Sequence, residues 1–334
     1  MKKIIAVISI TFIVQFGFIC SLKAQVDPHF SQYYANPLWL NPALTGVIDG
    51  DIRINANVKN QWTGIPNGYK TSALSLDFRS GEKAGLGFNI LNQSAGTAGY
   101  NYFAAYGSYG YGIAVSADGT QKLHFGVQAG IINRSFDPSK LQFDDQYNPI
   151  IGYDPTAPSF EGFATTSATV FDASAGIFYY DGDPIHTANV FAGLSAAHLT
   201  SPKDPFTGGS IQSRLPVRFT AHAGVKIKAS DNFDVIPHAI YISQQTNTVK
   251  ALGVYSELKF EDDNGLILGG MYRIGDAAVA DAGYHLKNLV IGVSYDFNTS
   301  ALKSATNGQG GFELSLVYIF RKGPINPAAV CPKF

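Results

Sequence analysis

Apolar and polar residues alternate along most of the chain. In the segment 216–229, PVRFTAHAGVKIKA, the odd positions from Val217 to Ile227 are apolar, and the even positions from Arg218 to Lys228 are polar or glycine. A period of two residues is that of a β-strand. About eleven residues is also the length that a tilted strand needs to cross the hydrocarbon layer of a membrane.

The same pattern predicts fourteen strands. An even number is expected where a bacterial barrel begins and ends on one side of the membrane, although one merged or split hairpin would give about twelve to sixteen. The predicted strands span 51–60, 69–79, 84–92, 99–111, 122–133, 167–180, 187–198, 216–229, 233–242, 249–260, 264–274, 278–286, 289–297 and 311–321. The fourth could extend through 112–116.

The connections between these strands differ in length. Those after even-numbered strands are short, whereas those after odd-numbered strands include the two longest, 134–166 and 199–215. Outer-membrane barrels have short periplasmic turns and long external loops. The sequence therefore predicts an all-β, antiparallel up-and-down transmembrane barrel with both termini in the periplasm. A secreted β-sandwich or propeller also alternates, but sandwich strands are shorter and a propeller repeats every 40 to 50 residues or so.

The first residues have the pattern of an export signal. Lys2 and Lys3 precede an apolar stretch, and we place cleavage after Ala24. A lipoprotein signal at Cys20 is the alternative, but Ile19 fits poorly before the modified cysteine. We therefore divide the chain into a signal peptide (1–24), an N-terminal segment (25–50), a barrel (51–321) and a periplasmic tail (322–334).

Composition and charge exclude several classes of protein. The predicted mature chain has 21 basic and 25 acidic residues, a formal charge of −4, because Lys2, Lys3 and Lys23 are removed. No basic stripe remains for nucleic acid. Only Cys331 survives processing, which excludes a disulfide framework. Beyond the signal no apolar run is long enough for a membrane-spanning helix, yet 46% of residues are hydrophobic, which is too many for disorder.

No candidate catalytic or metal site emerges, and we expect neither a cofactor nor an enzyme. His124, His222, His238 and His285 stand singly in predicted strands, without the spacing of metal ligands. Ser108 lacks the surrounding pattern of a nucleophile elbow. Three acidic clusters could offer oxygen ligands to Ca²⁺, but none follows the EF-hand spacing, and we favour solvated turns and loops as their explanation. These clusters are Asp144–Asp145, Asp181 with Asp183, and 261–265.

The connection 134–166 is rich in proline and aromatic residues. A disordered loop would carry fewer aromatics, so we expect either a lid folded over the pore or an external surface that docks a partner. The candidate docking residues are Phe136, Phe143, Tyr147, Tyr153 and Phe160.

The segment before the first strand, QVDPHFSQYYANPLWLNPALTG (25–46), neither alternates nor resembles a polar linker. Its large apolar side chains would each cost about 1.5 to 3 kcal/mol to leave in water. Asn36-Pro37 and Asn41-Pro42 each impose a turn or a helix start. We expect a short element that either plugs the lumen or packs on the periplasmic side, and self-packing and partner contact both remain open for it.

This segment resembles the N-terminal signature of the PorP/SprF family of the type IX secretion system of Bacteroidota, in which D-P-x-F-S-Q-Y and N-P-A-x-x-G recur. Here Ala43 and Gly46 complete the second motif. The resemblance marks the following as plug or partner-binding residues: Asp27, Pro28, Phe30, Ser31, Gln32, Tyr33, Tyr34, Asn36, Pro37, Trp39, Asn41 and Pro42.

The resemblance implies a non-enzymatic outer-membrane protein of type IX secretion or gliding. Its expected partners are the C-terminal domain of a secreted cargo protein or adhesin, other components of the secretion machinery, and membrane lipids. The alternative is a channel for small solutes, since a barrel of this size is wide enough for an open lumen unless it is plugged.

Overall fold

The computed structural model describes residues 27–321, except 63, 66, 160, 164, 204–213 and 262. The predicted signal peptide, its cleavage site and Cys20 lie outside the described residues. So do the predicted tail with Cys331, the candidate loop residue Phe160, and Asp262 of the third acidic cluster.

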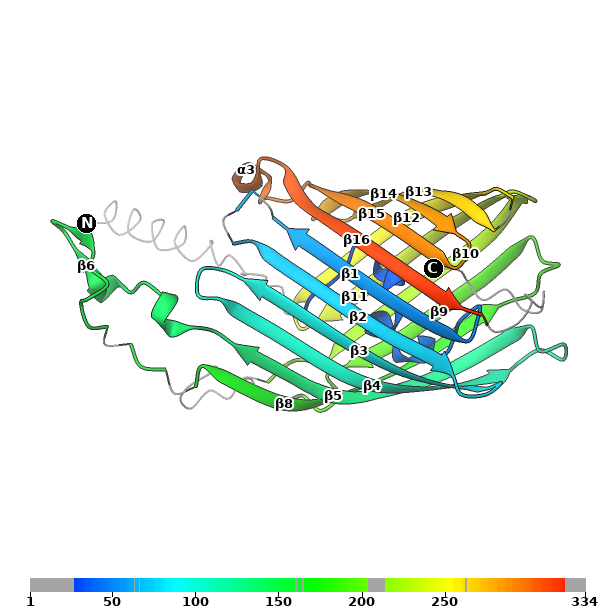
Figure 1. Cartoon of the computed structure of the whole chain (residues 1–334), viewed down its shortest axis with the longest axis horizontal. Helices are drawn as coiled ribbons and strands as arrows, with labels where there is room; N and C mark the ends of the chain where they lie inside the picture. Colours follow the sequence, from blue (N-terminus) through cyan, green and yellow to red (C-terminus); the bar gives the residue numbers. More distant parts are fainter. Residues whose placement is uncertain are drawn as a thin grey trace, which may run out of the picture.

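Fourteen long strands form one closed antiparallel barrel (Figure 1), in which β1 pairs with β16 and so closes the sheet. Each strand pairs with its sequence neighbour, except that β8 follows β5 across a long loop. The strands are β1 (Ile52–Gln61), β2 (Tyr69–Arg79), β3 (Ala84–Ala95), β4 (Tyr100–Ala114), β5 (Gln121–Ser135), β8 (Ser167–Asp181), β9 (Ala188–Ala197), β10 (Arg218–Ser230), β11 (Phe233–Gln244), β12 (Asn247–Lys259), β13 (Asn264–Arg273), β14 (Ala277–Leu286), β15 (Leu289–Asn298) and β16 (Gln309–Phe320).

The fourteen-strand prediction is confirmed, with most boundaries within two or three residues of the expected ones. The open question about the fourth strand is resolved, because β4 continues to Ala114 and leaves only residues 115–120 as a turn. The sequence did not predict the hairpin β6 (Tyr147–Asn148) and β7 (Gly152–Tyr153), which lies within the loop between β5 and β8 and pairs separately from the barrel.

The alternation along each strand separates a lumen-facing from an outward-facing row. On β16, Glu313 and Ser315 are buried toward the lumen, whereas Phe312 is 46% and Tyr318 38% exposed on the outer surface. Large apolar side chains on the outer face are stable against lipid, which contains no water to exclude them. The polar side chains on the opposite face of each strand therefore line the lumen.

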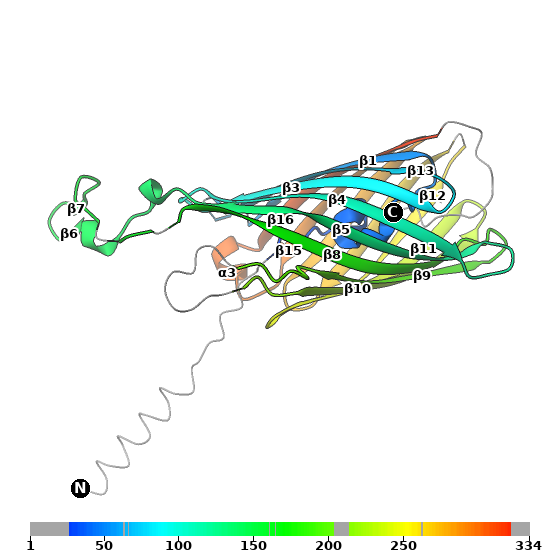
Figure 2. The ribbon, with the colours of Figure 1, turned by 90° about the horizontal axis from the view of Figure 1, so that it is seen from below.

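The two ends of the barrel differ. At one end, here the short-turn end, the connections are 80–83, 115–120, 182–187, 231–232, 260–263 and 287–288. At the other, the long-loop end, lie 136–166 and 198–217, with the small helix α3 (Lys303–Thr306) between β15 and β16. Figure 2 shows the loop that carries β6 and β7 projecting well beyond this end.

The described residues before β1, from Asp27 onward, lie inside the barrel and form three short helices: η1 (Tyr33–Ala35), α2 (Pro37–Leu40) and η2 (Pro42–Leu44) (Figure 1). Pro37 and Pro42 each occupy the first turn of a helix, where proline's missing N–H needs no partner. The side chain of Asn41 caps η2 by accepting from the N–H of Ala43 at 2.9 Å.

The expectation that both termini lie in the periplasm concerns residues outside the described ranges, and it stays a prediction. The even strand number does put Ile52 and Phe320 at the same, short-turn end, where they pair directly. However, the N-terminal residues run back through the lumen, so that Asp27 lies among residues of the long-loop end. The described residues therefore begin, at Asp27, and finish, beside Phe320, at opposite ends of the barrel. No helix in the described ranges is long and apolar enough to cross a membrane.

Candidate functional site

The N-terminal segment, defined here as residues 27–49, runs lengthwise through the lumen. At the long-loop end, Asp27 bonds to residues that flank β9 and β10. At the short-turn end, Asp49 accepts two hydrogen bonds from Arg321, just beyond β16. Between them the segment contacts strands on several sides of the barrel. It therefore occupies the place where a channel would otherwise be.

A buried ion cluster holds Asp27. Oδ2 of Asp27 lies 2.7 Å from Nε2 of His198 and accepts from Arg218 at 3.0 Å, and Nδ1 of His198 lies 2.7 Å from Asp172 on β8. Burial alone would lower the pKa of His198, but the two carboxylates raise it to about 9. Burial would raise the pKa of Asp27, but His198 and Arg218 lower it to about 2. Both groups are therefore charged at neutral pH.

A second cluster holds Ser31. Its N–H donates to Glu313 at 2.7 Å, and its hydroxyl donates to Asp296 at 2.7 Å. The same hydroxyl accepts from Lys59 at 2.8 Å and from Arg273 at 3.1 Å. Four charged side chains from four strands thus converge on one small residue. Since an unpaired buried charge is costly, this network fixes the position of the segment.

Aromatic side chains fill the middle of the lumen. Tyr33 and Tyr34 pack against each other with ring centroids 4.3 Å apart, and the hydroxyl of Tyr33 bonds to Nδ1 of His238. The ring of Tyr34 lies 5.8 Å from that of His222 and 5.7 Å from that of His238. His222 and His238, which are 16 positions apart in the sequence, therefore both pack against the ring of Tyr34.

Trp39 ties the two halves of the segment together. Its indole N–H donates to the carbonyl of Pro28 at 3.0 Å, and Arg218 lies over its ring at 5.2 Å. Phe30 and Trp39 belong to one apolar cluster with Leu91, Tyr102 and other lumen residues of β2 to β5. The segment is thus folded on itself as well as packed on the wall.

Asn41 reaches into the seam between β8 and β9. Its amide nitrogen donates to the carbonyl of Ile177 at 3.0 Å and to that of Leu194 at 3.3 Å, which are partners in the strand register. It also lies 3.2 Å from Nε2 of His222. Asn41 is fully buried, and its side chain joins two strands of the wall to the segment.

Glycines in the wall make room for this contact. A Cβ at Gly126 would lie 2.2 Å from the carbonyl carbon of Pro42, and one at Gly176 would lie 2.0 Å from the side-chain oxygen of Asn41. Likewise Gly85 faces Gly46, whose φ of +77° itself favours glycine. These glycines thus allow the second motif of the segment to approach the wall closely.

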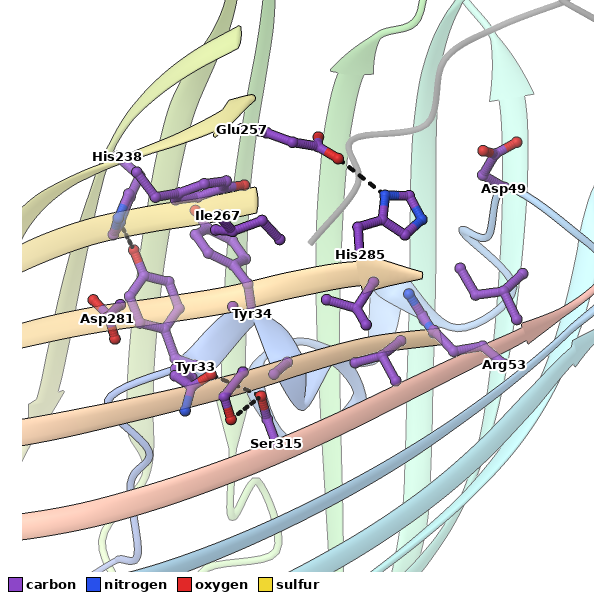
Figure 3. Close-up of a pocket in the computed structure, with 18 of the residues that line it drawn as sticks. Tyr33, Tyr34, Asp49, Arg53, His238, Glu257, Ile267, Asp281, His285 and Ser315 are labelled. Atoms are coloured by element: carbon purple, nitrogen blue, oxygen red, sulfur yellow. Dashed lines mark hydrogen bonds and ion pairs between the residues drawn. The ribbon is translucent and has the colours of Figure 1, made fainter. Parts of the chain in front are cut away.

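Among the described residues, two sizeable cavities lie beside the segment. The larger, about 650 Å³, opens at the long-loop end between Phe30, Trp39, Arg218 and Arg273. The smaller, about 150 Å³, lies toward the short-turn end, where Tyr33, Tyr34, His238 and Asp281 contribute to its wall (Figure 3). The segment separates the two.

The twelve signature residues named from the sequence all lie in this segment. Eleven of them are buried and Gln32 is partly buried. The sequence left two placements open for these residues, in the lumen or on the periplasmic side. In the structure they lie in the lumen. Because their side chains contact the wall and one another, little of their surface is left for a partner.

The four predicted strand histidines all touch other lumen side chains. Besides His222 and His238, His285 lies 2.9 Å from Glu257, and His124 packs near Tyr180. Asp181 of the second acidic cluster lies 2.7 Å from His186. Among the described residues, no three His, Cys, Asp or Glu side chains are grouped so as to hold a metal ion.

The loop residues named from the sequence lie far from the lumen. Phe136 and Phe143 both pack on Phe163, and Tyr147 packs on Tyr153 across the β6–β7 hairpin. At the tip of that hairpin, Ile150 is 91% and Ile151 68% exposed. The loop therefore projects outward and does not cover the pore (Figure 1).

Sequence reasoning missed the residues that hold the segment. Lys59, Arg273, Asp296, Glu313 and His198 were not singled out, although the first four stand at lumen-facing positions of their strands. The available signal was a charged residue within an alternating strand, which needs a partner inside the lumen.

Comparison with known proteins gives a family and a fold. The family model described as "Type IX secretion system membrane protein PorP/SprF" matches residues 22–318. No curated protein matches the sequence. Similar solved structures include the toluene transporter TbuX of Ralstonia pickettii, at 12% identity and a TM-score of 0.51, covering 85% of this chain and 93% of that one. Others are the CymD monoaromatic hydrocarbon channel, at 12% identity and a TM-score of 0.49 over 89% and 95% of the chains, and the P. putida toluene transporter TodX, at 11% and 0.47 over 85% and 93%. At 12% identity the likeness to TbuX concerns the fold alone.

Proposed function

The chain belongs to the PorP/SprF family of type IX secretion system membrane proteins, and we propose that it is a closed outer-membrane barrel that docks a secreted cargo protein or adhesin through that partner's C-terminal domain. It would thereby help to export the partner and hold it at the surface. The protein is a non-enzymatic component of the secretion system. In this proposal the short-turn end faces the periplasm and the long-loop end faces outward, as in other outer-membrane barrels.

The exposed tip of the β6–β7 hairpin carries the proposal. Ile150 and Ile151 stand in water at the end of a projecting loop, with Tyr147 beside them 52% exposed. A soluble surface rarely exposes neighbouring large apolar side chains unless they bind a partner. Aromatic and apolar residues are also enriched at the buried centre of protein interfaces.

The filled lumen argues for docking over the alternative, a channel for small solutes. The N-terminal segment is held at its two ends and in the middle by hydrogen bonds and ion pairs, of which those at Ser31 and Asp27 are buried. A large, steady conductance from the purified protein would favour the channel and count against docking.

The docking proposal is tested by capturing the C-terminal domain of a secreted protein from the same cell on the purified barrel. The double variant Ile150→Asp, Ile151→Asp should weaken capture at least about tenfold, since centrally placed apolar contacts commonly contribute more than 1 kcal/mol each. The control is Ile185→Asp, which changes an equally exposed isoleucine (86%) in the turn 182–187 at the opposite end. Equal capture by both variants and the unchanged protein would exclude this loop as the docking site.

A further inference from the structure

The cavity toward the short-turn end contains one carboxylate without a counter-ion. Asp281, on β14, lines this cavity, and its Oδ1 is fully buried with no hydrogen-bond donor among the described residues. No ion pair of the described chain includes it. The cation that acts on it through space, Lys59, is already paired with Asp296 at 3.3 Å and Glu313 at 3.8 Å. The carboxylate therefore has room for an external cation.

The other charged groups of this cavity have partners. Arg53 is paired with Asp77 at 2.9 Å, and Arg321 with Asp49 at 3.3 Å. The carboxylate of Glu257 lies 2.9 Å from Nδ1 of His285. Neither arginine therefore offers a free charge to an anion. The uncompensated charge in the cavity is negative, so electrostatics favours a cationic ligand over an anionic one.

Aromatic rings line the same cavity beside Asp281 (Figure 3). Tyr33 and Tyr34 lie 4.3 Å apart, the ring of His238 lies 5.5 Å from Tyr33, and that of Tyr255 lies 5.6 Å from His238. Tyrosine faces attract cations, and organic ammonium groups are commonly held by such rings together with a carboxylate. Ile267 and Met271 add apolar surface for an alkyl chain.

We propose that this cavity binds a small primary alkylammonium group, with its nitrogen at Asp281 and its alkyl part against the tyrosines. A volume of about 150 Å³ holds a molecule about the size of benzene, which limits the ligand to a handful of heavy atoms. Two sources have this chemistry: a free small amine, or the end of a lysine side chain on a partner at this end of the barrel. The proposal is independent of docking at the long-loop end.

The test is calorimetry on the purified barrel in detergent at pH 8, with n-butylammonium as the probe and 1-butanol as its neutral analogue. We expect saturable binding of n-butylammonium and none of butanol. Asp281→Asn, which keeps the shape but not the charge, should weaken binding at least tenfold. Asp231→Asn removes an exposed charge from the turn 231–232 at the same end and should leave affinity within about twofold.

Two further arms complete the experiment. The peptide acetyl-Gly-Lys-Gly-amide tests a lysine side chain as the source, and acetyl-Gly-norleucine-Gly-amide is its uncharged control. Binding of n-butylammonium or of the lysine peptide supports the proposal. Tyr255→Leu should weaken amine binding several-fold and keeps the test valid if the Asp281 variant fails to fold. Absence of saturable binding by both amines, equal binding of butanol, or unchanged affinity in folded Asp281→Asn would overturn it.

Discussion

The backbone N–H of Ser31 donates a 2.7 Å hydrogen bond to the carboxylate of Glu313, although 282 positions separate the two residues in the sequence. The bond joins the start of the described chain to the strand that closes the barrel. Both groups are buried, so water cannot replace either partner if the bond is lost. Closure of the barrel and seating of the N-terminal segment are therefore linked at this point.

The first prediction concerns the hydroxyl of Ser31. Ser31→Ala removes the atom that meets Lys59, Arg273 and Asp296, and should destabilise the seated segment by about 1 to 3 kcal/mol. Hydrogen exchange of residues 31–46 should increase accordingly. The control, Ser72→Ala on the exposed face of β2, should not change it. Unchanged exchange in Ser31→Ala would mean that the ion network does not hold the segment.

The second prediction concerns space in the wall. Gly126→Val would place a Cβ 2.2 Å from Pro42, and because this neighbour is backbone, the segment must move. We expect protease cleavage within 36–46 to become faster in detergent. Gly107→Val is the matched control on the adjacent strand β4, since nothing lies within 4 Å of a Cβ there. Equal protection of the two variants would contradict the packing described for this motif.

The strands could be predicted from the sequence because the residues of a barrel strand face lipid and the lumen in turn, so that apolar and polar residues alternate. The burial of Phe30, Tyr33 and Trp39 was also predictable, since their side chains are costly in water. Their location was not, because the groups that hold them lie on distant strands. Asn41, for example, bonds to carbonyls of residues 177 and 194. No one-dimensional pattern encodes such pairings.

The same limit applies to the path of the N-terminal segment. Counting strands places Ile52 and Phe320 at one end, but it cannot detect a segment that folds back before β1. His198 was missed for a related reason, since it lies just after β9 and gains its role only beside Asp27 and Asp172. The sequence names the signature residues, and only the structure gives their depth in the lumen.

The third prediction is a pH dependence of the Asp27–His198 cluster. The pKa of His198 is raised from 6.5 to about 9, so its stabilisation is complete below about pH 6.5 and is lost as the pH rises through about 9. The pKa of Asp27 is lowered from 3.8 to about 2, so its contribution is complete above about pH 3.8 and is lost as the pH falls through about 2. The cluster is strongest between these limits.

Trp39 can report this change, because Arg218 bridges its ring and Asp27. In a Trp62→Phe background Trp39 is the one remaining tryptophan of the chain. Its emission should shift to the red between about pH 7 and pH 10 as the segment loosens at the long-loop end. His198→Gln should abolish the step. A step of equal size in that variant would assign the transition to another group.

The last prediction separates the role of the N-terminal segment, which fills the lumen, from that of the β6–β7 hairpin, which docks the partner. The wall consists of backbone hydrogen bonds between neighbouring strands, which do not involve the segment. Deleting 27–42 should therefore leave a barrel in the outer membrane, but with an open lumen and a measurable single-channel conductance. Cargo export should be lost as well, because the buried charged side chains around Ser31 lose the residue that they bond to and the lumen is no longer filled. Deleting 144–155 instead removes the β6–β7 hairpin and leaves the lumen filled, so docking should fail without any rise in conductance. Normal export by the first deletion would refute a functional role for the segment, and rising conductance in the second would show that the hairpin also restricts the pore.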